Sequence, residues 1–180
     1  MDVSDWQDRY FVSVDGLRLY YRDYAALEAG RVPVLCLPGL TRNCRDFAAT
    51  ALRLRHTRRV LSPDLRGRGR SQHDPNWQNY HPGTYLTDIA RLLEHAGVQR
   101  VVLLGTSLGG ILSMLLCATA PRLPAGVILN DIGPEVAAEG LQRISSYVGR
   151  SAPVRSWDEA AAQMRATYGL AMPDASDEDW

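Results

Sequence analysis

The feature that most constrains the fold of this chain is the apolar run from residue 101 to 112, which is interrupted once by Gly105-Thr106-Ser107-Leu108-Gly109. Residues 101–104 have the length and β-branching of a central parallel strand, and residues 110–117 have the apolar density of a buried helix. The two glycines that flank Ser107 leave room for a sharp turn, which lifts the serine hydroxyl out of the sheet. The pattern predicts a strand–turn–helix unit that presents Ser107 as a nucleophile; the alternative is a small-residue turn in an ordinary strand–helix unit.

Length and charge limit the classes of protein to which the chain can belong. It has 180 residues, of which 46% are hydrophobic and 22% charged, so it is long enough to bury a core. Basic and acidic side chains number 20 each, so no net field favours nucleic acid or an anionic membrane surface. No stretch is long enough to span a bilayer, and the N-terminus lacks the features of a signal peptide. We expect a cytoplasmic protein that binds neither nucleic acid nor membrane.

The cysteines indicate neither a disulfide framework nor a metal site. Cys36 falls in a predicted buried strand, Cys117 in a predicted buried helix and Cys44 in or near a loop. Three cysteines cannot all pair within the chain, and their spacing fits no metal-binding pattern. Free thiols suit a reducing compartment, and we expect no metal and no organic cofactor.

The order of the predicted elements indicates an α/β fold. Two alternating strands, residues 10–14 and 17–24, are joined at Asp15-Gly16, a strong hairpin signal, and should form an antiparallel edge ribbon. Strands and helices then alternate, with strands predicted at 32–37, 59–63, 101–104 and 126–130 and helices at 45–55, 82–96 and 110–120. This alternation predicts a mostly parallel sheet with helices on both faces.

The pattern changes beyond Asp131, where residues 134–149 and 157–168 look helical with no strand between them. Ser156 and Glu159 form the pattern of a capping box. Ser176 would cap a third helix with acidic residues in its first turn, and a frayed acidic tail is the alternative. We divide the chain into a core of six strands, residues 1–131, and an incomplete helical lid, residues 132–180.

Four segments, in this order, resemble the α/β-hydrolase fold superfamily, and within it the small cytosolic esterases, lactonases and carbon–carbon bond hydrolases. They are Leu35–Leu40, Asp64–Ser71, the turn around Ser107 and Leu129–Pro134. The resemblance implies a serine hydrolase that forms an acyl-enzyme from a small ester, lactone, thioester or carbon–carbon bond beside a carbonyl. It disfavours a dehalogenase or an epoxide hydrolase, because those relatives carry aspartate at the nucleophile position.

The same resemblance assigns the groups around the nucleophile. The backbone N–H groups of Leu40 and Leu108 would bind the oxyanion that develops during acyl transfer. Many relatives have His-Gly where this chain has Pro38-Gly39, but the change leaves a backbone role intact. The residues expected to line the site are Gly39, Thr106 and Gly109.

Asp131 ends the strand that follows the Ser107 unit. Groups at the carboxyl ends of strands line the site in doubly wound sheets, so we expect Asp131 to line it. In some relatives the acid of the catalytic triad lies here, and in others it follows a later strand that this sequence does not contain. Whether Asp131 orients a histidine or caps the following turn stays open.

The arginine-rich segment from Asp64 to Ser71 is expected to be structural. A short basic run without interleaved aromatic residues is poor evidence for RNA binding, and its glycines match no phosphate-binding pattern. We expect a tight loop whose arginines pair with nearby carboxylates and carbonyls. The alternative is that Arg66 or Arg68 binds an acidic substrate.

A serine hydrolase needs a base, which in this family is a histidine near the C-terminus. The histidines of this chain are His56, His73, His81 and His95, and none matches that position. The strand that ends near Asp131 would also be an unprotected sheet edge. We therefore expect the N-terminal part of a longer hydrolase, inactive by itself, with a small acyl substrate and either a second copy or a C-terminal complement as partners.

Two other classes of protein are possible for such a chain. A noncatalytic fragment or pseudoenzyme would act as a binding or interaction module, which the absent histidine and the exposed edge support. A dinucleotide-binding oxidoreductase would share the fold class, but the glycine fingerprint of such proteins is absent.

Overall fold

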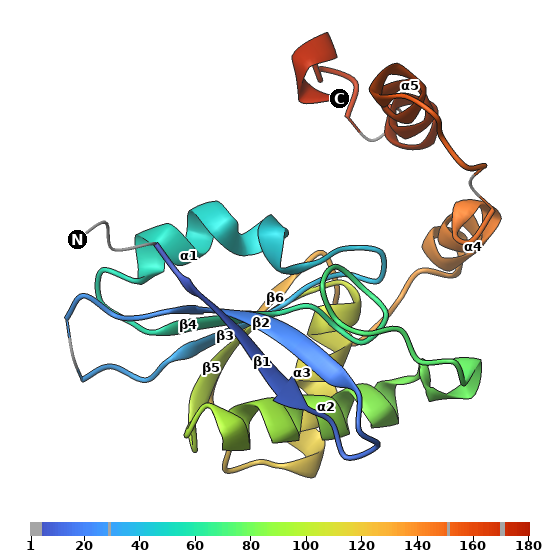
Figure 1. Ribbon diagram of the computed structural model, residues 1–180. Coiled ribbons are helices and arrows are strands. Elements are labelled where there is room, and N and C mark those ends of the chain that lie inside the picture. Colours follow the sequence, from blue (N-terminus) through green and yellow to red (C-terminus); the bar gives the residue numbers. More distant parts are fainter. Residues whose placement is uncertain (1–4, 29, 151, 170–171) are drawn as a thin grey trace. The chain divides into compact units, whose positions relative to one another are not determined.

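The computed structural model describes residues 5–28, 30–150, 152–169 and 172–180, and it confirms the α/β class (Figure 1). The chain divides into two units, Met1–Pro134 and Glu135–Trp180, each described by itself. The first unit contains a six-stranded sheet with the strand order β1-β2-β4-β3-β5-β6. The strands are β1 (Gln7–Val12), β2 (Arg18–Tyr24), β3 (Val34–Leu37), β4 (Val60–Pro63), β5 (Val101–Thr106) and β6 (Pro124–Asn130).

The predicted hairpin forms one edge of this sheet. Strand β1 pairs antiparallel with β2, β2 pairs antiparallel with β4, and β4, β3, β5 and β6 run parallel. Strand β1 ends two residues before the predicted Val14, because Ser13 already belongs to the hairpin loop, where its N–H donates to the Leu17 carbonyl. Gly16 supplies the positive φ of 88° that the loop needs.

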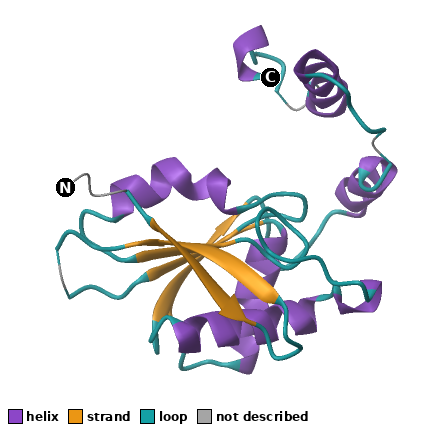
Figure 2. Cartoon of the chain, in the orientation of Figure 1, coloured by secondary structure: helices purple, strands orange, loops and turns teal. Residues whose placement is uncertain are grey.

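Helices cover both faces of the sheet, as predicted (Figure 2). They are η1 (Cys44–Phe47), α1 (Ala48–Leu54), α2 (Pro82–His95) and α3 (Leu108–Thr119), and a further short turn, η2 (Trp77–Asn79), precedes α2 without covering the sheet. The predicted helix at 45–55 begins as a tighter 3₁₀ turn, capped by Asn43, whose side chain accepts a hydrogen bond from the Arg45 N–H. The short turn η2 was not predicted.

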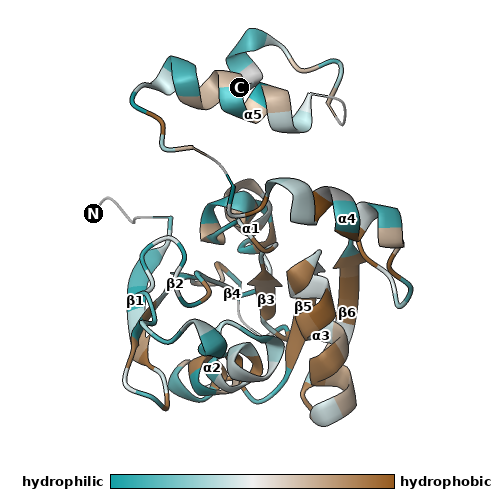
Figure 3. Cartoon of the chain, turned by 90° about the vertical axis from the view of Figure 1, so that its right-hand side faces the viewer, coloured by the Kyte–Doolittle hydropathy of each residue, from teal (hydrophilic) through white to brown (hydrophobic). Residues whose placement is uncertain are grey.

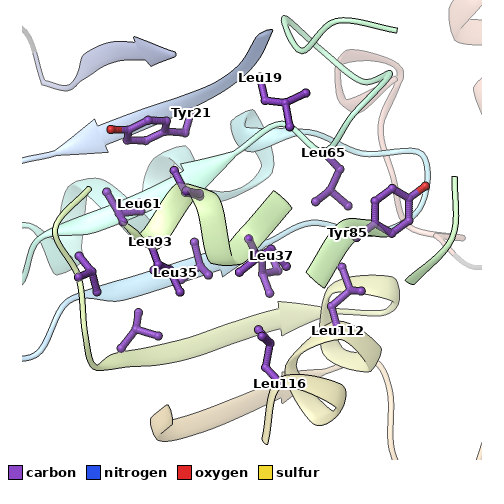
Figure 4. Close-up of a cluster of buried hydrophobic side chains, with 14 of the residues drawn as sticks. Leu19, Tyr21, Leu35, Leu37, Leu61, Leu65, Tyr85, Leu93, Leu112 and Leu116 are labelled. Carbon is purple, nitrogen blue, oxygen red and sulfur yellow. The ribbon is translucent and has the colours of Figure 1, made fainter. Parts of the chain in front are cut away.

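The core consists of two clusters of buried side chains, one on each face of the sheet. In β3, Leu35 and Leu37 belong to the cluster that includes residues of α2 and α3 (Figure 4). Val34 and Cys36 alternate with them and pack on the other face, together with Ala51 of α1. Strand β3 is therefore buried on both faces, which explains why its sequence is a continuous apolar run.

Strand β6 forms the other edge of the sheet and pairs only with β5 among the described residues. Its apolar side chains Val127, Ile128 and Leu129 are 38%, 54% and 37% exposed. The strand belongs to the most hydrophobic part of the first unit, together with β5 and α3 (Figure 3). The prediction of an unprotected apolar edge is confirmed for the described part of the chain.

The second unit contains α4 (Ala138–Tyr147), α5 (Trp157–Tyr168) and the 3₁₀ turn η3 (Asp177–Asp179). Helix α5 has the predicted bounds, and Ser156 caps it by accepting from the Glu159 N–H. The Glu159 carboxylate reaches back to the N–H of Arg155 and not of Ser156, so the capping box forms only in part. The third helix expected after Ser176 is a single turn. That this unit belongs to a lid stays a prediction.

Candidate active site

Ser107 lies on a strained turn between β5 and α3. Its backbone angles are φ 49° and ψ −113°, a combination that residues with a side chain rarely adopt. The Ser107 N–H donates to the Asn130 carbonyl at 3.0 Å, and the Ser107 carbonyl accepts from the N–H groups of Gly110 and Ile111. Hydrogen bonds on both sides therefore hold the conformation, and the serine side chain stays half-buried at the carboxyl end of β5.

The glycines around Ser107 allow α3 to pack directly against the sheet. A Cβ atom on Gly109 would lie 1.9 Å from the carbonyl oxygen of Leu37, and one on Gly105 would lie 2.3 Å from the carbonyl oxygen of Gly109. Gly110, which the sequence analysis did not single out, approaches Ile132 in the same way, at 2.2 Å from Cγ2. Real Cβ atoms essentially never make contacts this short, so the turn requires glycine at 105 and 109, where the neighbour is backbone, and at 110 a side chain would have to displace Ile132.

The turn after β3 lies beside Ser107. It spans Gly39 to Arg42 and is closed by a hydrogen bond from the Arg42 N–H to the Gly39 carbonyl at 3.2 Å. A Cβ atom on Gly39 would lie 3.8 Å from both the Ser107 Cβ and the Thr106 carbonyl oxygen. Among the described residues, no acceptor pairs with the N–H of Leu40 or Leu108. Unpaired backbone donors next to the serine are what an oxyanion hole needs.

Asp131 follows β6 in a left-handed conformation, with φ 56°. It is exposed, and no described residue makes a hydrogen bond to its carboxylate. The preceding residue, Asn130, donates from its side chain to Thr106 Oγ1 at 3.3 Å, which joins the ends of β5 and β6. Asp131 and Ser107 thus both lie at the carboxyl ends of their strands. That Asp131 orients a histidine stays a prediction.

All four histidines are described, and none makes a hydrogen bond to Ser107 Oγ. His81 caps α2: its Nδ1 accepts from the Gly83 N–H, and its Nε2 lies 3.0 Å from Thr84 Oγ1. His56 and His95 come shortly before β4 and β5, so they lie at the amino ends of the strands, whereas Ser107 lies at the carboxyl ends. His73 is exposed in the loop after β4. No described histidine is therefore paired with Ser107 in this structure.

Arg66 is buried and is shared by three carboxylates, as a structural role predicts. Its Nε and Nη2 donate to Asp88 at 2.7 and 2.8 Å, and its Nη1 donates to Asp15 at 2.8 Å and to Asp74 at 2.6 Å. The hydrogen bond to Asp88 is the largest of the causes that raise the pKa of Arg66. Arg66 in turn lowers the pKa of Asp15 to about 2. Arg66 therefore ties the hairpin, the loop after β4 and α2 together.

A cavity of about 560 Å³ lies near the Ser107 turn, between α1 and the ends of β5 and β6. Its lining includes Phe47, Leu104, Thr106, Ile128 and Asn130, but not Ser107, so we do not assign it to a substrate. In the described ranges, no cluster of three or more His, Cys, Asp or Glu side chains is placed to hold a metal. No described helix is both long and apolar enough to cross a membrane.

Comparison with known proteins identifies the family. A model of the alpha/beta hydrolase fold family matches residues 32–172, and the chain belongs to this family. The chain is 34% identical over 168 residues to a 3-hydroxybutyrate-oligomer hydrolase from Cupriavidus necator. It is 47% identical to an alpha/beta hydrolase from Novosphingobium aromaticivorans, whose crystal structure it matches with a TM-score of 0.93. It is also 30% identical over 129 residues to human epoxide hydrolase 4.

These matches cover most of this chain but only part of the other proteins. The match to the Cupriavidus protein covers 91% of this chain and 57% of that protein. The match to the Novosphingobium structure covers 99% of this chain and 62% of that one, and the match to the human protein covers 71% of this chain and 35% of that protein. Each of these three proteins is named as a hydrolase, and this chain spans about a third to two thirds of their length.

Proposed function

We propose that this chain carries the nucleophile and the oxyanion-binding groups of a serine hydrolase. The observation that carries the proposal is Ser107, held by backbone hydrogen bonds in a strained turn beside the unpaired N–H groups of Leu40 and Leu108. A conformation that costs roughly 1–3 kcal/mol is kept at functional sites, because it aims a side chain that an ordinary turn would bury.

In the proposed reaction, Ser107 Oγ attacks the carbonyl carbon of the substrate while a base removes its proton. The carbonyl oxygen becomes an oxyanion, which the N–H groups of Leu40 and Leu108 stabilise. The tetrahedral intermediate collapses, the leaving group takes the proton, and an acyl-enzyme forms at Ser107. Water then releases the acid by the same steps in reverse. We propose a histidine as the base, oriented by Asp131 or by another carboxylate; none of the four described histidines is hydrogen-bonded to Ser107.

We propose a short ester of a hydroxy acid as the first substrate class to test, because the Cupriavidus relative is named for such oligomers. Other small esters, lactones, thioesters and carbon–carbon bonds beside a carbonyl are the alternatives. Epoxide hydrolysis is disfavoured despite the human relative, since a serine stands where an aspartate nucleophile would be needed. We also propose a cytoplasmic location, which the three free cysteines support, and a mechanism without metal or organic cofactor.

Replacing the nucleophile in the intact natural protein tests this proposal. Ser107→Ala should lower kcat for 3-hydroxybutyrate oligomers and p-nitrophenyl esters by roughly 10⁴-fold or more. Ser145→Ala, which changes an exposed serine of α4, is the matched control and should leave kcat unchanged. Equal turnover by the Ser107→Ala protein and the control would reject the serine mechanism.

A noncatalytic interaction module is the second candidate function, and the exposed, uncharged strand β6 favours it. Such an edge offers unpaired backbone groups to a second copy or to another chain. If the 180-residue chain acts this way, sedimentation should show a dimer that Ile128→Lys dissociates. A monomer that hydrolyses esters would exclude this function.

A further inference from the structure

A side chain from the loop after β4 holds the turn that carries Leu40. The Nε of Arg68 donates to the carbonyl oxygen of Leu40 at 2.5 Å. The peptide that joins Leu40 to Thr41 is the central peptide of the turn closed by Gly39 and Arg42. Turn types differ mainly in the orientation of this central peptide, so a bond to its carbonyl selects one orientation.

The other arginines of the loop have a different environment. Arg66 and Arg70 both form ion pairs with carboxylates. Arg68 makes its hydrogen bonds to neutral acceptors only: the Leu40 carbonyl, the Arg66 carbonyl at 3.0 Å and the Tyr85 hydroxyl at 3.2 Å. No carboxylate of the described residues pairs with it. Its charge is therefore directed onto backbone carbonyls beside the site.

The loop after β4 also holds the end of the Leu40 segment, residues 38–44, at Cys44. The buried carboxylate of Asp64 accepts from the Cys44 N–H at 2.8 Å and from the Arg70 N–H at 2.7 Å. At the near end, Leu37 pairs with Gly105 in the sheet. Between these anchors Leu40 is 39% exposed, so packing fixes only part of its surface. The bond from Arg68 adds a constraint at the Leu40 carbonyl to the hydrogen bond that closes the turn.

We infer that Arg68 is a positioning residue for the oxyanion hole, acting through the Leu40 peptide. The inference rests on the proposed function of Ser107 and Leu40. Without the guanidinium, the Leu40 carbonyl loses its side-chain partner, and Leu40, whose N–H belongs to the preceding peptide, is held in place only by the hydrogen bond that closes the turn. The Leu40 residue can then shift, and its N–H is no longer fixed at the place where the oxyanion forms. The cost should fall on the transition state and not on substrate binding, because the ground-state carbonyl carries little charge.

The test uses three variants of the intact natural protein: Arg68→Met, Arg68→Lys and the control Arg70→Met. Met keeps the length of the stem but removes the donors, whereas Lys keeps a donor. Arg70 lies in the same loop and loses the same charge, but its side chain pairs with Asp8, away from the Leu40 turn. For each variant, kcat and KM for a p-nitrophenyl ester are measured, together with the Ki of an alkylboronic acid and of the planar product acid.

Arg68→Met should lower kcat by about 10- to 100-fold. It should raise the Ki of the boronic acid by a similar factor, because the tetrahedral adduct of this inhibitor occupies the oxyanion hole. KM and the Ki of the product acid should stay within about twofold of wild type. Arg68→Lys should recover part of the loss, and Arg70→Met should resemble wild type. Added guanidinium at millimolar concentration should also raise the activity of Arg68→Met.

Two results would overturn the inference. One is an Arg68→Met protein with the kcat and boronic-acid affinity of Arg70→Met. The other is an equal increase in the Ki of the boronic acid and in the Ki of the product acid, together with a lower Tm. This combination would show that the Arg68 side chain only stabilises the fold. If Arg68→Met does not fold, the same comparison between Arg68→Lys and Arg70→Met decides. Failure of the proposed function is separate, because it shows as unchanged turnover in Ser107→Ala.

Discussion

Two neighbouring regions at the carboxyl ends of the strands differ in whether buried charges hold them. The Ser107 turn, residues 105–110, is held by backbone hydrogen bonds and by glycines in close contact, and it contains no charged residue. The arginine loop, residues 64–74, also has backbone hydrogen bonds and closely packed glycines, but it adds buried charged side chains, Arg66 and Asp64, that bind partners outside the loop. The first region therefore depends on close packing, whereas the second also depends on its buried charges, Arg66 and Asp64.

The largest effect on stability is expected in the arginine loop. Arg66→Met removes the cation that three carboxylates share and leaves Asp88 buried without a partner. The free energy of unfolding should fall by about 4 kcal/mol, because an uncompensated buried charge remains. Urea unfolding measures it. Arg70→Met, which breaks an exposed pair with Asp8, is the control and should cause no measurable loss. Equal stability of the two variants would show that the pairs around Arg66 do not hold the loop.

The Ser107 turn should respond to a single added methyl group. In Gly109→Ala the new Cβ would lie 1.9 Å from the Leu37 carbonyl oxygen, so α3 must move away from β3. We expect a loss of about 3 kcal/mol, from overpacking alone. Gly126→Ala in β6 is the control, because nothing lies within 4 Å of its added Cβ. A Tm for Gly109→Ala equal to that of Gly126→Ala would refute the close packing.

The strain at Ser107 predicts a smaller effect on stability, in which the smaller side chain is the stabilising one. Glycine adopts positive φ without steric cost, so Ser107→Gly should be more stable than Ser107→Ala by about 1 kcal/mol, although both lack the nucleophile. Thermal unfolding of the two variants measures the difference. A more stable alanine variant would mean that the conformation of Ser107 is not strained.

The smallest predicted effect is a pH dependence that comes from Asp15. Arg66 lowers the pKa of Asp15 to about 2, so the ionised carboxylate stabilises the folded state above the ordinary pKa near 4. This contribution is lost as the pH falls from about 4 to about 2, and water screens it because the side chain is 41% exposed. Asp15→Asn should therefore lose less stability than wild type over that interval in urea unfolding. Parallel pH profiles would contradict the assignment.

Much of the fold follows from local patterns in the sequence. The apolar runs of β3 and β5 and the Asp15-Gly16 signal predicted the sheet and its hairpin, and helix α5 has the predicted bounds because Ser156 caps it. The bounds that differ are set by contacts outside those patterns. In the hairpin, for example, the Ser13 N–H donates to the Leu17 carbonyl, so Ser13 belongs to the loop and β1 ends at Val12.

The candidate site was predictable only where the signal is local. The spacing of Gly105, Ser107 and Gly109 predicted the turn, but no pattern indicated the contact of Arg68 with Leu40, which lies 28 residues away in the sequence. Such a contact depends on how two loops meet after the sheet has formed. The same holds for Arg66, whose partner Asp15 is 51 residues away.

The most direct test of the central proposal is to trap the acyl-enzyme. The intact natural protein is mixed with a slowly hydrolysed ester, quenched in acid and digested, and its peptides are weighed by mass spectrometry. The proposal predicts one acyl group on the peptide that contains Ser107, and none in the Ser107→Ala protein. Turnover without an adduct on Ser107, or an adduct on another residue, would contradict it.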